Sequence, residues 1–148
     1  TNKVFVVHGH DDAARESVAR FLERLGLEAV ILHEQATGGR TIIEKLEYYA
    51  DVDFATFLIT PDDIGGVKTS EGDKLQPRAR QNVILELGFF VGKLGRDKVC
   101  ALHDGPLELP TDYLGICYVR LDDGGGWRLQ LAKELRAAGF SVDLNLAL

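Results

Sequence analysis

Short apolar runs alternate with amphipathic segments along the whole chain, and this alternation limits the possible folds more than any other feature. The runs that fit buried strands lie at 3–7, 29–32, 54–60, 99–102 and 116–121. The segments with the three- and four-residue apolar spacing of helices lie at 11–25, 41–50, 78–94 and 127–138. Continuously apolar strands joined by helices indicate a parallel sheet that is covered on both faces. The sequence therefore predicts an α/β fold with a five-stranded parallel sheet in the flavodoxin-like order 2-1-3-4-5.

Capping signals mark the ends of two of the predicted helices. Asp11 or Asp12 is placed to accept a hydrogen bond at the start of the first helix, and Gly26 is placed to end it. Thr41 and Glu44 have the spacing of a capping box, in which each side chain bonds the other residue's backbone N–H. These signals predict that the second helix opens at Thr41.

The remaining segments are read as irregular. Residues 61–77 are polar and rich in glycine, so they predict a long loop, and residues 140–144 predict a terminal extended piece. The 148 residues suit a single domain, 1–148. Because the chain starts at Thr1 and contains no Met, we expect it to be a piece of a longer protein with a separate sensor domain.

Charge and cysteine usage narrow the range of partners and compartments. The formal net charge is -6, which argues against a nucleic-acid interface and against an anionic membrane surface as partners. No apolar run reaches transmembrane length and no signal peptide opens the chain, so a cytoplasmic location is expected. Cys100 and Cys117 both lie in apolar runs and are expected to be buried thiols.

All four histidines follow predicted strands, at the edge where ligands bind in sheets of this type. His8 and His10 follow the first strand, while the other two follow the second and fourth. Neither a dinucleotide fingerprint nor a P-loop is present. The two glycines before Arg40, at a helix start, fit either a phosphate site or a simple turn. The spacing of His8, His10 and Asp12 leaves a metal-dependent hydrolase as an alternative.

Glu86 is the only polar residue within the apolar run 83–92. A carboxylate in such surroundings must be paired, solvated in a cleft or raised in pKa, and both residues three and four positions onward are phenylalanines. One interpretation is a narrow solvated stripe with Asn82 and Lys93, and the other is the lining of a cleft. A carboxylate in a cleft suits cleavage of an N-glycosidic bond through an oxocarbenium-like state, because a cationic nicotinamide leaves without a general acid.

Five stretches of the sequence carry a resemblance to a known family. They are residues 4–11, 33–45, 58–63, 78–88 and 109–115. On these motifs the chain resembles the bacterial TIR-like domain family, the NAD-cleaving effector domains of cyclic-nucleotide-triggered antiphage systems such as CBASS, Pycsar and TIR-STING. The resemblance extends over residues 4–144.

The resemblance implies a flavodoxin-like TIR fold and a NAD+ glycohydrolase that releases nicotinamide and ADP-ribose or a cyclic form. NAD+ would be the substrate, with no cofactor and no metal, and Glu86 would be the catalytic residue. Self-association through TIR–TIR contacts, in which the loop 34–40 takes part, would activate the enzyme under a cyclic-nucleotide sensor domain in the same or a partner chain. The residues expected to bind substrate, with Arg40 as the phosphate candidate, are Phe5, His8, Gly9, Asp11, Arg40, Arg78, Arg80, Asn82 and Tyr113.

One departure from the family pattern bears on the site. Animal NAD-cleaving TIR domains often carry Trp or Cys in the turn before the glutamate, where this chain has residues 81–83, Gln-Asn-Val. The group that stacks on nicotinamide is therefore expected to be Phe5 or Tyr113. Besides the metal hydrolase, two alternatives stay open: a non-catalytic TIR module that only assembles, and a nucleoside-processing enzyme such as a deoxyribosyltransferase.

Overall fold

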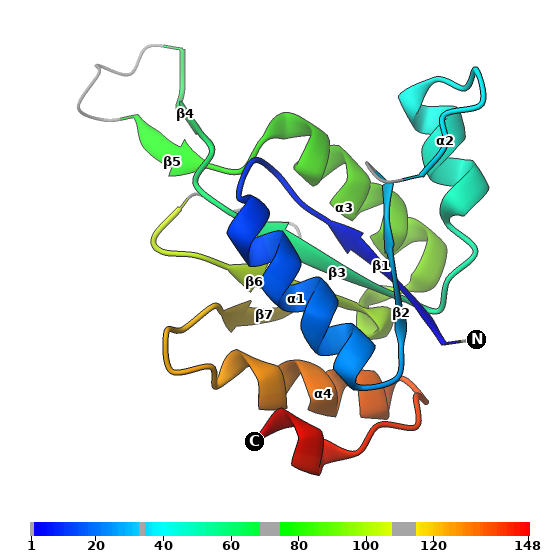
Figure 1. Ribbon diagram of the computed structural model, residues 1–148. Coiled ribbons are helices and arrows are strands. Elements are labelled where there is room, and N and C mark those ends of the chain that lie inside the picture. The colour runs from blue at the N-terminus through cyan, green and yellow to red at the C-terminus, as the bar shows by residue number, and fades with distance from the viewer. Residues whose placement is uncertain (1, 33–34, 69–74, 108–114) are drawn as a thin grey trace.

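A parallel sheet forms the centre of the protein (Figure 1). The computed structural model describes residues 2–32, 35–68, 75–107 and 115–148. Within these ranges the sheet has five strands, in the order β2-β1-β3-β6-β7, and every neighbouring pair is parallel. Their bounds are β1 Lys3–Val7, β2 Glu28–Ile31, β3 Phe54–Ile59, β6 Val99–His103 and β7 Cys117–Arg120. The predicted α/β fold and its strand order 2-1-3-4-5 are confirmed.

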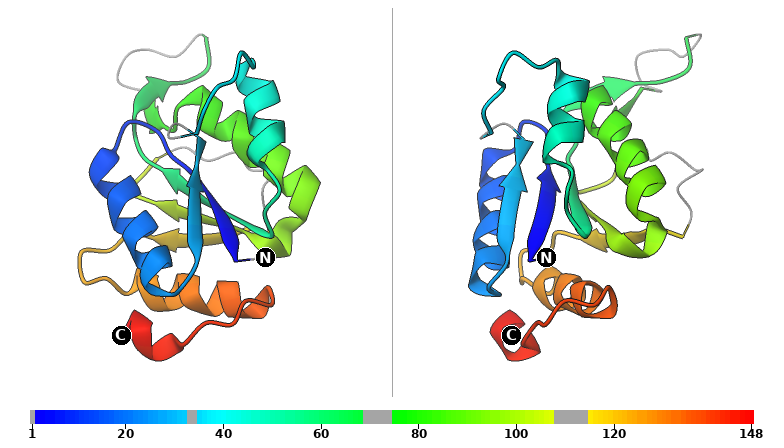
Figure 2. Two further views of the ribbon diagram at one scale, coloured as in Figure 1. Left: turned by 45° about the vertical axis from the view of Figure 1, so that its right-hand side comes forward. Right: turned by 90° about the vertical axis from the view of Figure 1, so that its right-hand side faces the viewer.

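Helices cover both faces of the sheet (Figure 2). Their bounds are α1 Asp12–Arg24, α2 Ile42–Tyr49, α3 Gln81–Leu94 and α4 Trp127–Ala137. α1 and α4 share one apolar core, while α2 and α3 share the other. The alternation of side chains along β1 feeds both cores, with Val4 and Val6 in the first and Phe5 and Val7 in the second. The continuous apolar runs of the sequence thus reflect strands that are buried on both faces.

The capping signals act as the sequence predicts. Asp11 accepts a hydrogen bond from the backbone N–H of Ala14 at 3.0 Å and so caps α1. Gly26, just beyond the end of that helix, has a φ of +85°, a conformation that favours glycine. Thr41 and Glu44 form the reciprocal capping box, with N···O distances of 3.2 and 3.1 Å.

The segment predicted as a long loop contains a hairpin, so that prediction is wrong in part. β4 (Asp63–Gly65) pairs in antiparallel fashion with β5 (Gln76–Arg78), and the two project from the body of the fold (Figure 1). Three-residue strands with a proline in one of them carry too little apolar alternation to be recognised. Because Arg78 pairs with Asp63 in this hairpin, α3 begins at Gln81 rather than at residue 78.

The end of the chain adds a short 3-10 turn after the segment that the sequence predicts as an extended piece. Phe140 and Val142 are buried in the core beneath α4, and a 3-10 turn follows at Leu144–Ala147. Asp143 caps this turn by accepting a hydrogen bond from Asn145 N–H at 3.0 Å. The apolar residues of this segment therefore anchor a cap on the core and do not add a strand.

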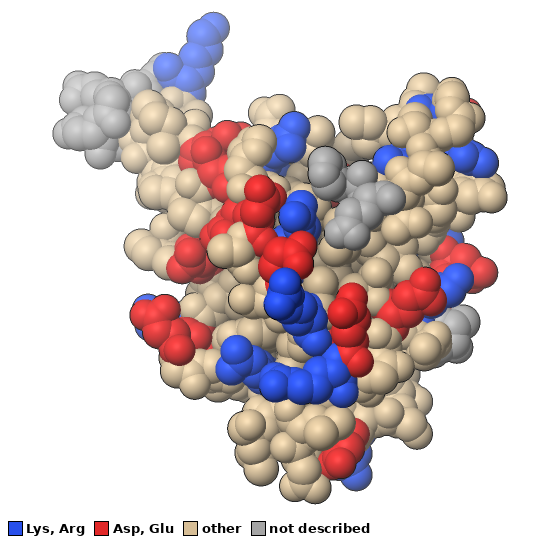
Figure 3. Space-filling model, viewed as in Figure 1, with Lys and Arg blue, Asp and Glu red and all other residues tan. Residues whose placement is uncertain are grey.

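The face that α1 covers carries acidic and basic side chains intermixed (Figure 3). Arg15 lies 3.3 Å from Asp12, and Arg20 lies 3.8 Å from Glu16. Arg20 is exposed and Arg15 is partly buried, and ion pairs at these helix spacings contribute little to stability. In the described ranges, every helix is too short or too polar to span a membrane.

The two cysteines lie opposite each other on the neighbouring strands β6 and β7. Their Sγ atoms are 3.5 Å apart and both thiols are free. Cys100 is fully buried, as expected, whereas Cys117 on the edge strand is only half-buried.

Candidate functional site

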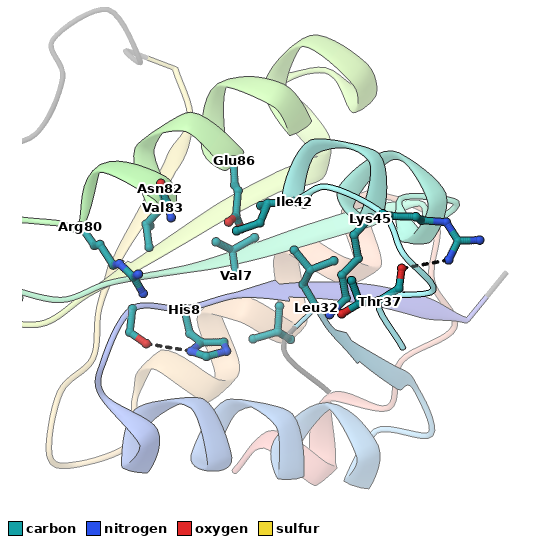
Figure 4. A pocket seen from close by; sticks show the side chains of 13 residues that line it. Val7, His8, Leu32, Thr37, Ile42, Lys45, Arg80, Asn82, Val83 and Glu86 are labelled. Atoms are coloured by element: carbon teal, nitrogen blue, oxygen red, sulfur yellow. Dashed lines mark hydrogen bonds between the residues drawn. The ribbon is translucent and has the colours of Figure 1, made fainter. Parts of the chain in front are cut away.

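A pocket of about 450 Å³ opens at the carboxyl ends of β1 and β2, between α2 and α3 (Figure 4). Its floor is the end of β1, and its walls come from the loop before α2, from α2 itself and from the first turns of α3. The lining residues are Val6, Val7, His8, Gly9, Leu32, Thr37, Arg40, Ile42, Lys45, Arg80, Asn82, Val83 and Glu86. The pocket therefore lies at the edge of the sheet where the sequence places a ligand site.

Glu86 lies on the α3 wall, one turn after Asn82 (Figure 4). The next residue, Leu87, is fully buried in the core, which fixes the face that α3 turns to the sheet. Glu86 is half-buried, and burial raises the pKa of its carboxyl from 4.5 to about 7, while the charge of Arg80 acts in the opposite direction. The carboxyl thus lies in a cleft and has a raised pKa, which agrees with the interpretation that Glu86 lines a cleft.

The competing interpretation, a solvated stripe along α3, fits the structure only in part. Asn82 shares the pocket with Glu86, but Lys93, two turns onward, is exposed and does not line it. The carboxyl of Glu86 therefore lacks the lysine that the stripe requires, and the nearby cation is Arg80.

The loop after β1 is held against the end of β3 by Asp62. One carboxylate oxygen of Asp62 accepts hydrogen bonds from Thr60 Oγ1 at 2.9 Å and from the backbone N–H of His10 at 3.3 Å. A Cβ atom on Gly9 would overlap this carboxylate, so any larger residue there would displace Asp62 from its hydrogen bonds. His8 Nδ1 donates to the carbonyl oxygen of Gly9 at 2.9 Å. These contacts set the shape of the pocket floor.

Arg40 borders the pocket, but its guanidinium is engaged elsewhere. Its Cζ lies 3.6 Å from the ring centroid of Tyr48, an exposed side chain that is not part of the lining. Its Nη1 also donates to the carbonyl oxygen of Thr37 at 3.3 Å. The side chain that supplies a positive charge on the α2 wall of the pocket is Lys45, which sequence reasoning did not select.

Six of the predicted site residues line this pocket together. They are His8, Gly9, Arg40, Arg80, Asn82 and Glu86. Arg78 lies instead in β5, where it borders a neighbouring depression that shares Arg80 and Asn82 with the pocket. Asp11 is occupied as the cap of α1 and is not among the lining residues. Tyr113 lies outside the described residues.

The placement of Phe5 beside the pocket is wrong. Its side chain is 0% exposed and packs against Phe90, with ring centroids 4.7 Å apart. Phe5 points to the same face of the sheet as Val7, which lines the pocket, but it lies two residues earlier in β1 and is buried in the core under α3. It therefore cannot stack on a ligand, and the described lining residues include no Phe, Tyr or Trp.

The sequence also missed the lining that α2 and the residue after β2 contribute. Leu32 and Ile42 are apolar, Lys45 is charged, and all three line the pocket. A signal was present, because Ile42 and Lys45 are three residues apart on the predicted second helix and so share a face. The alternative metal site built on His8, His10 and Asp12 has no support, since the described residues contain no group of three potential ligands arranged for a metal.

Comparison with known proteins adds a family to this geometry. Residues 3–123 match the family model described as "CAP12/Pycsar effector protein, TIR domain". The chain is 52% identical over 149 residues to the protein YuaY of Escherichia coli (strain K12), an alignment that covers 100% of this chain and 49% of that protein. This chain thus spans about half the length of YuaY.

Among the similar proteins are some that carry functional names. The Pycsar effector protein PaPycTIR of Pseudomonas aeruginosa is 35% identical over 106 residues, which cover 70% of this chain and 31% of that protein. CD-NTase-associated protein 12 of Niabella drilacis is 40% identical over 81 residues, which cover 55% of this chain and 25% of that protein. In both relatives the similar part is a minor share of a longer protein.

Proposed function

Because the chain belongs to the family of CAP12/Pycsar effector TIR domains, we propose that it is a NAD+ nucleosidase and the effector domain of an antiphage system. The observation that carries this proposal is the carboxyl of Glu86, which lies half-buried in the pocket with a pKa raised to about 7. Strongly perturbed carboxyls in clefts are typical of functional sites.

The chemistry needs one carboxylate and an enclosed site. The nicotinamide of NAD+ is cationic while it is bonded to ribose, so it departs as a neutral molecule without a general acid. Departure leaves an oxocarbenium-like ribose, which the carboxylate of Glu86 stabilises. Apolar lining residues such as Val7, Leu32 and Val83 lower the local dielectric and so strengthen that interaction. Water then adds to the ribose carbon and releases a proton, or an intramolecular group adds to give a cyclic product.

The raised pKa of Glu86 fits this role. Burial alone favours the neutral acid, and a cationic substrate placed beside it favours the carboxylate. The ionised form is therefore stabilised when NAD+ binds and stabilised further as positive charge moves to the ribose. The charge of Arg80 keeps the pKa from rising higher in the absence of substrate.

Self-association is part of the proposal, and α2 supports it. Three large apolar side chains on this helix are exposed, Ile42 by 60%, Ile43 by 45% and Tyr48 by 61%. Because only Leu46 of this helix is buried, most of its surface, including these side chains, is available for contacts with another molecule. We propose that contacts between copies of this domain in the cytoplasm, controlled by a cyclic-nucleotide sensor in the same or a partner chain, bring the enzyme into its active form.

The test is consumption of NAD+ by concentrated protein, either with a crowding agent or fused to an oligomerising domain. Wild type is expected to release nicotinamide, and Glu86→Gln is expected to leave NAD+ intact. Glu23→Gln, which removes the same charge from an exposed position on α1, serves as the control and should match wild type. If assembled wild type leaves NAD+ intact, the domain is better described as a non-catalytic assembly module.

A further inference from the structure

We infer that Lys45 binds the diphosphate of the substrate, so that the dinucleotide lies across the pocket from the α3 wall to the α2 wall. This inference rests on the function proposed above and names a substrate-binding residue for it. It also assigns the substrate class, a nicotinamide nucleoside that carries phosphate, in preference to a free nucleoside.

The surroundings of Lys45 indicate a cation that is ready for an anionic ligand. Its side chain is half-buried and lines the pocket beside Leu32 and Thr37 (Figure 4). Within the four described ranges, its ammonium has neither an ion pair nor a hydrogen bond. A cation partly withdrawn from water gains more from an added anion than an exposed one does, because solvent and salt screen it less.

The other two cations at the pocket are less suited to the same task. The guanidinium of Arg40 stacks on Tyr48 and bonds to the Thr37 carbonyl, so an anion would have to compete with these contacts. Arg80 is exposed, and its charge acts on Glu86, whose pKa it lowers. Arg80 thus belongs to the carboxylate side of the pocket.

The charges of the pocket are therefore separated, and this separation matches the substrate. Glu86 stands on the α3 wall and Lys45 on the α2 wall, with the side chain of Ile42 drawn between them in the view of Figure 4. NAD+ has a cationic pyridinium at one end of a ribose and an anionic diphosphate at the other. With the pyridinium ribose at Glu86 and the diphosphate at Lys45, each charge of the ligand meets the opposite charge of the protein.

The inference predicts a selective loss of affinity. Binding is measured by calorimetry in the Glu86→Gln background, which is expected to leave NAD+ intact. Adding Lys45→Gln is expected to weaken NAD+ binding by about tenfold or more, since one charged contact to phosphate is lost. Lys45→Arg should retain most of the affinity. Lys133→Gln, at an exposed position on α4, removes the same charge and should have no effect.

A second ligand pair separates this inference from the proposed reaction. ADP-ribose, which contains the diphosphate, should bind the wild-type protein and lose affinity with Lys45→Gln, whereas nicotinamide riboside, which has no phosphate, should bind both equally. If wild type binds ADP-ribose through Lys45 yet leaves NAD+ intact, the proposed reaction fails and the phosphate site stands. Equal affinity of wild type and Lys45→Gln for ADP-ribose, or no binding by either, overturns the inference.

Discussion

Replacement of Glu86 by glutamine is expected to stabilise the fold, and to do so more at high pH than at low pH. Burial raises the pKa of this carboxyl from 4.5 to about 7. The folded protein therefore holds the proton more tightly than the unfolded chain, and ionisation of Glu86 destabilises the folded state as the pH rises from about 4.5 to 7. Below 4.5 both states are protonated and this cost is absent, whereas above 7 it is fully present.

The size of the effect follows from the same two pKa values. The pKa of Glu86 rises from 4.5 to about 7, and each pKa unit corresponds to 1.36 kcal/mol, so the full cost of ionisation is about 3 kcal/mol at pH 8. At pH 5, which is only slightly above the pKa of the unfolded chain, the cost is about 1 kcal/mol. Glutamine resembles the protonated acid in shape and carries no charge, so Glu86→Gln removes this cost. In a domain of this size, 3 kcal/mol corresponds to a rise in melting temperature of roughly 6 to 12 °C.

The assay is urea unfolding of wild type and Glu86→Gln at pH 5 and pH 8, with Glu23→Gln as the control for loss of an exposed charge. The gain in unfolding free energy from Glu86→Gln should be larger at pH 8 by about 2 kcal/mol, while the control should show no comparable difference between the two pH values. A gain that is equal at pH 5 and pH 8 would refute the argument that burial governs the ionisation of Glu86.

Two further substitutions test the surroundings of the pocket. Arg80→Gln removes the charge that lowers the pKa of Glu86, so the rise of kcat/KM for NAD+ with pH should move to higher pH; an unchanged profile would contradict the electrostatic role of Arg80. Gly9→Ala forces a Cβ against the carboxylate of Asp62 and is expected to destabilise the protein by about 1–3 kcal/mol and to impair NAD+ cleavage, as measured by urea unfolding and nicotinamide release. Gly92→Ala, within α3, serves as the control, because no atom lies close to the added Cβ, and it should be neutral or stabilising. An equal loss of stability in both variants would show that the contact with Asp62 does not cause the destabilisation by Gly9→Ala.

The sequence predicts the strands, the helices and the place of Glu86 on α3 because each depends on periodicity within a single element. The strand order follows from the alternation of strands and helices along the chain, which is typical of a flavodoxin-like sheet. The hairpin of β4 and β5 escaped prediction because its pairing depends on residues far apart in a polar segment. The error at Phe5 has a different origin. Alternation along β1 places Phe5 on the same face as Val7, which lines the pocket, but Phe5 lies two residues earlier and packs against Phe90 of α3. This packing between two elements, which the sequence does not show, separates Phe5 from the ligand.

The electrostatics of the site were predicted unevenly for a similar reason. The raised pKa of Glu86 follows from its apolar neighbours along α3, which are visible in the sequence. The engagement of Arg40 with Tyr48 depends on where two side chains meet in space, so Arg40 alone was chosen and Lys45 was overlooked. Sequence patterns thus identified which elements contribute to the pocket, while the choice among their charged side chains needed the structure.

The α2 wall of the pocket is only lightly anchored, and this has a consequence for hydrogen exchange. Of the residues from Ile42 to Tyr49, only Leu46 is buried, whereas the α3 wall buries Val83, Leu87 and Phe90. Amides of α2 should therefore exchange with solvent deuterium faster than those of α3, through local opening that leaves the sheet intact. A dinucleotide that contacts both walls would link the weakly held helix to the firmly held one. Exchange in α2 should then slow when ADP-ribose is added, while exchange in α3 changes little.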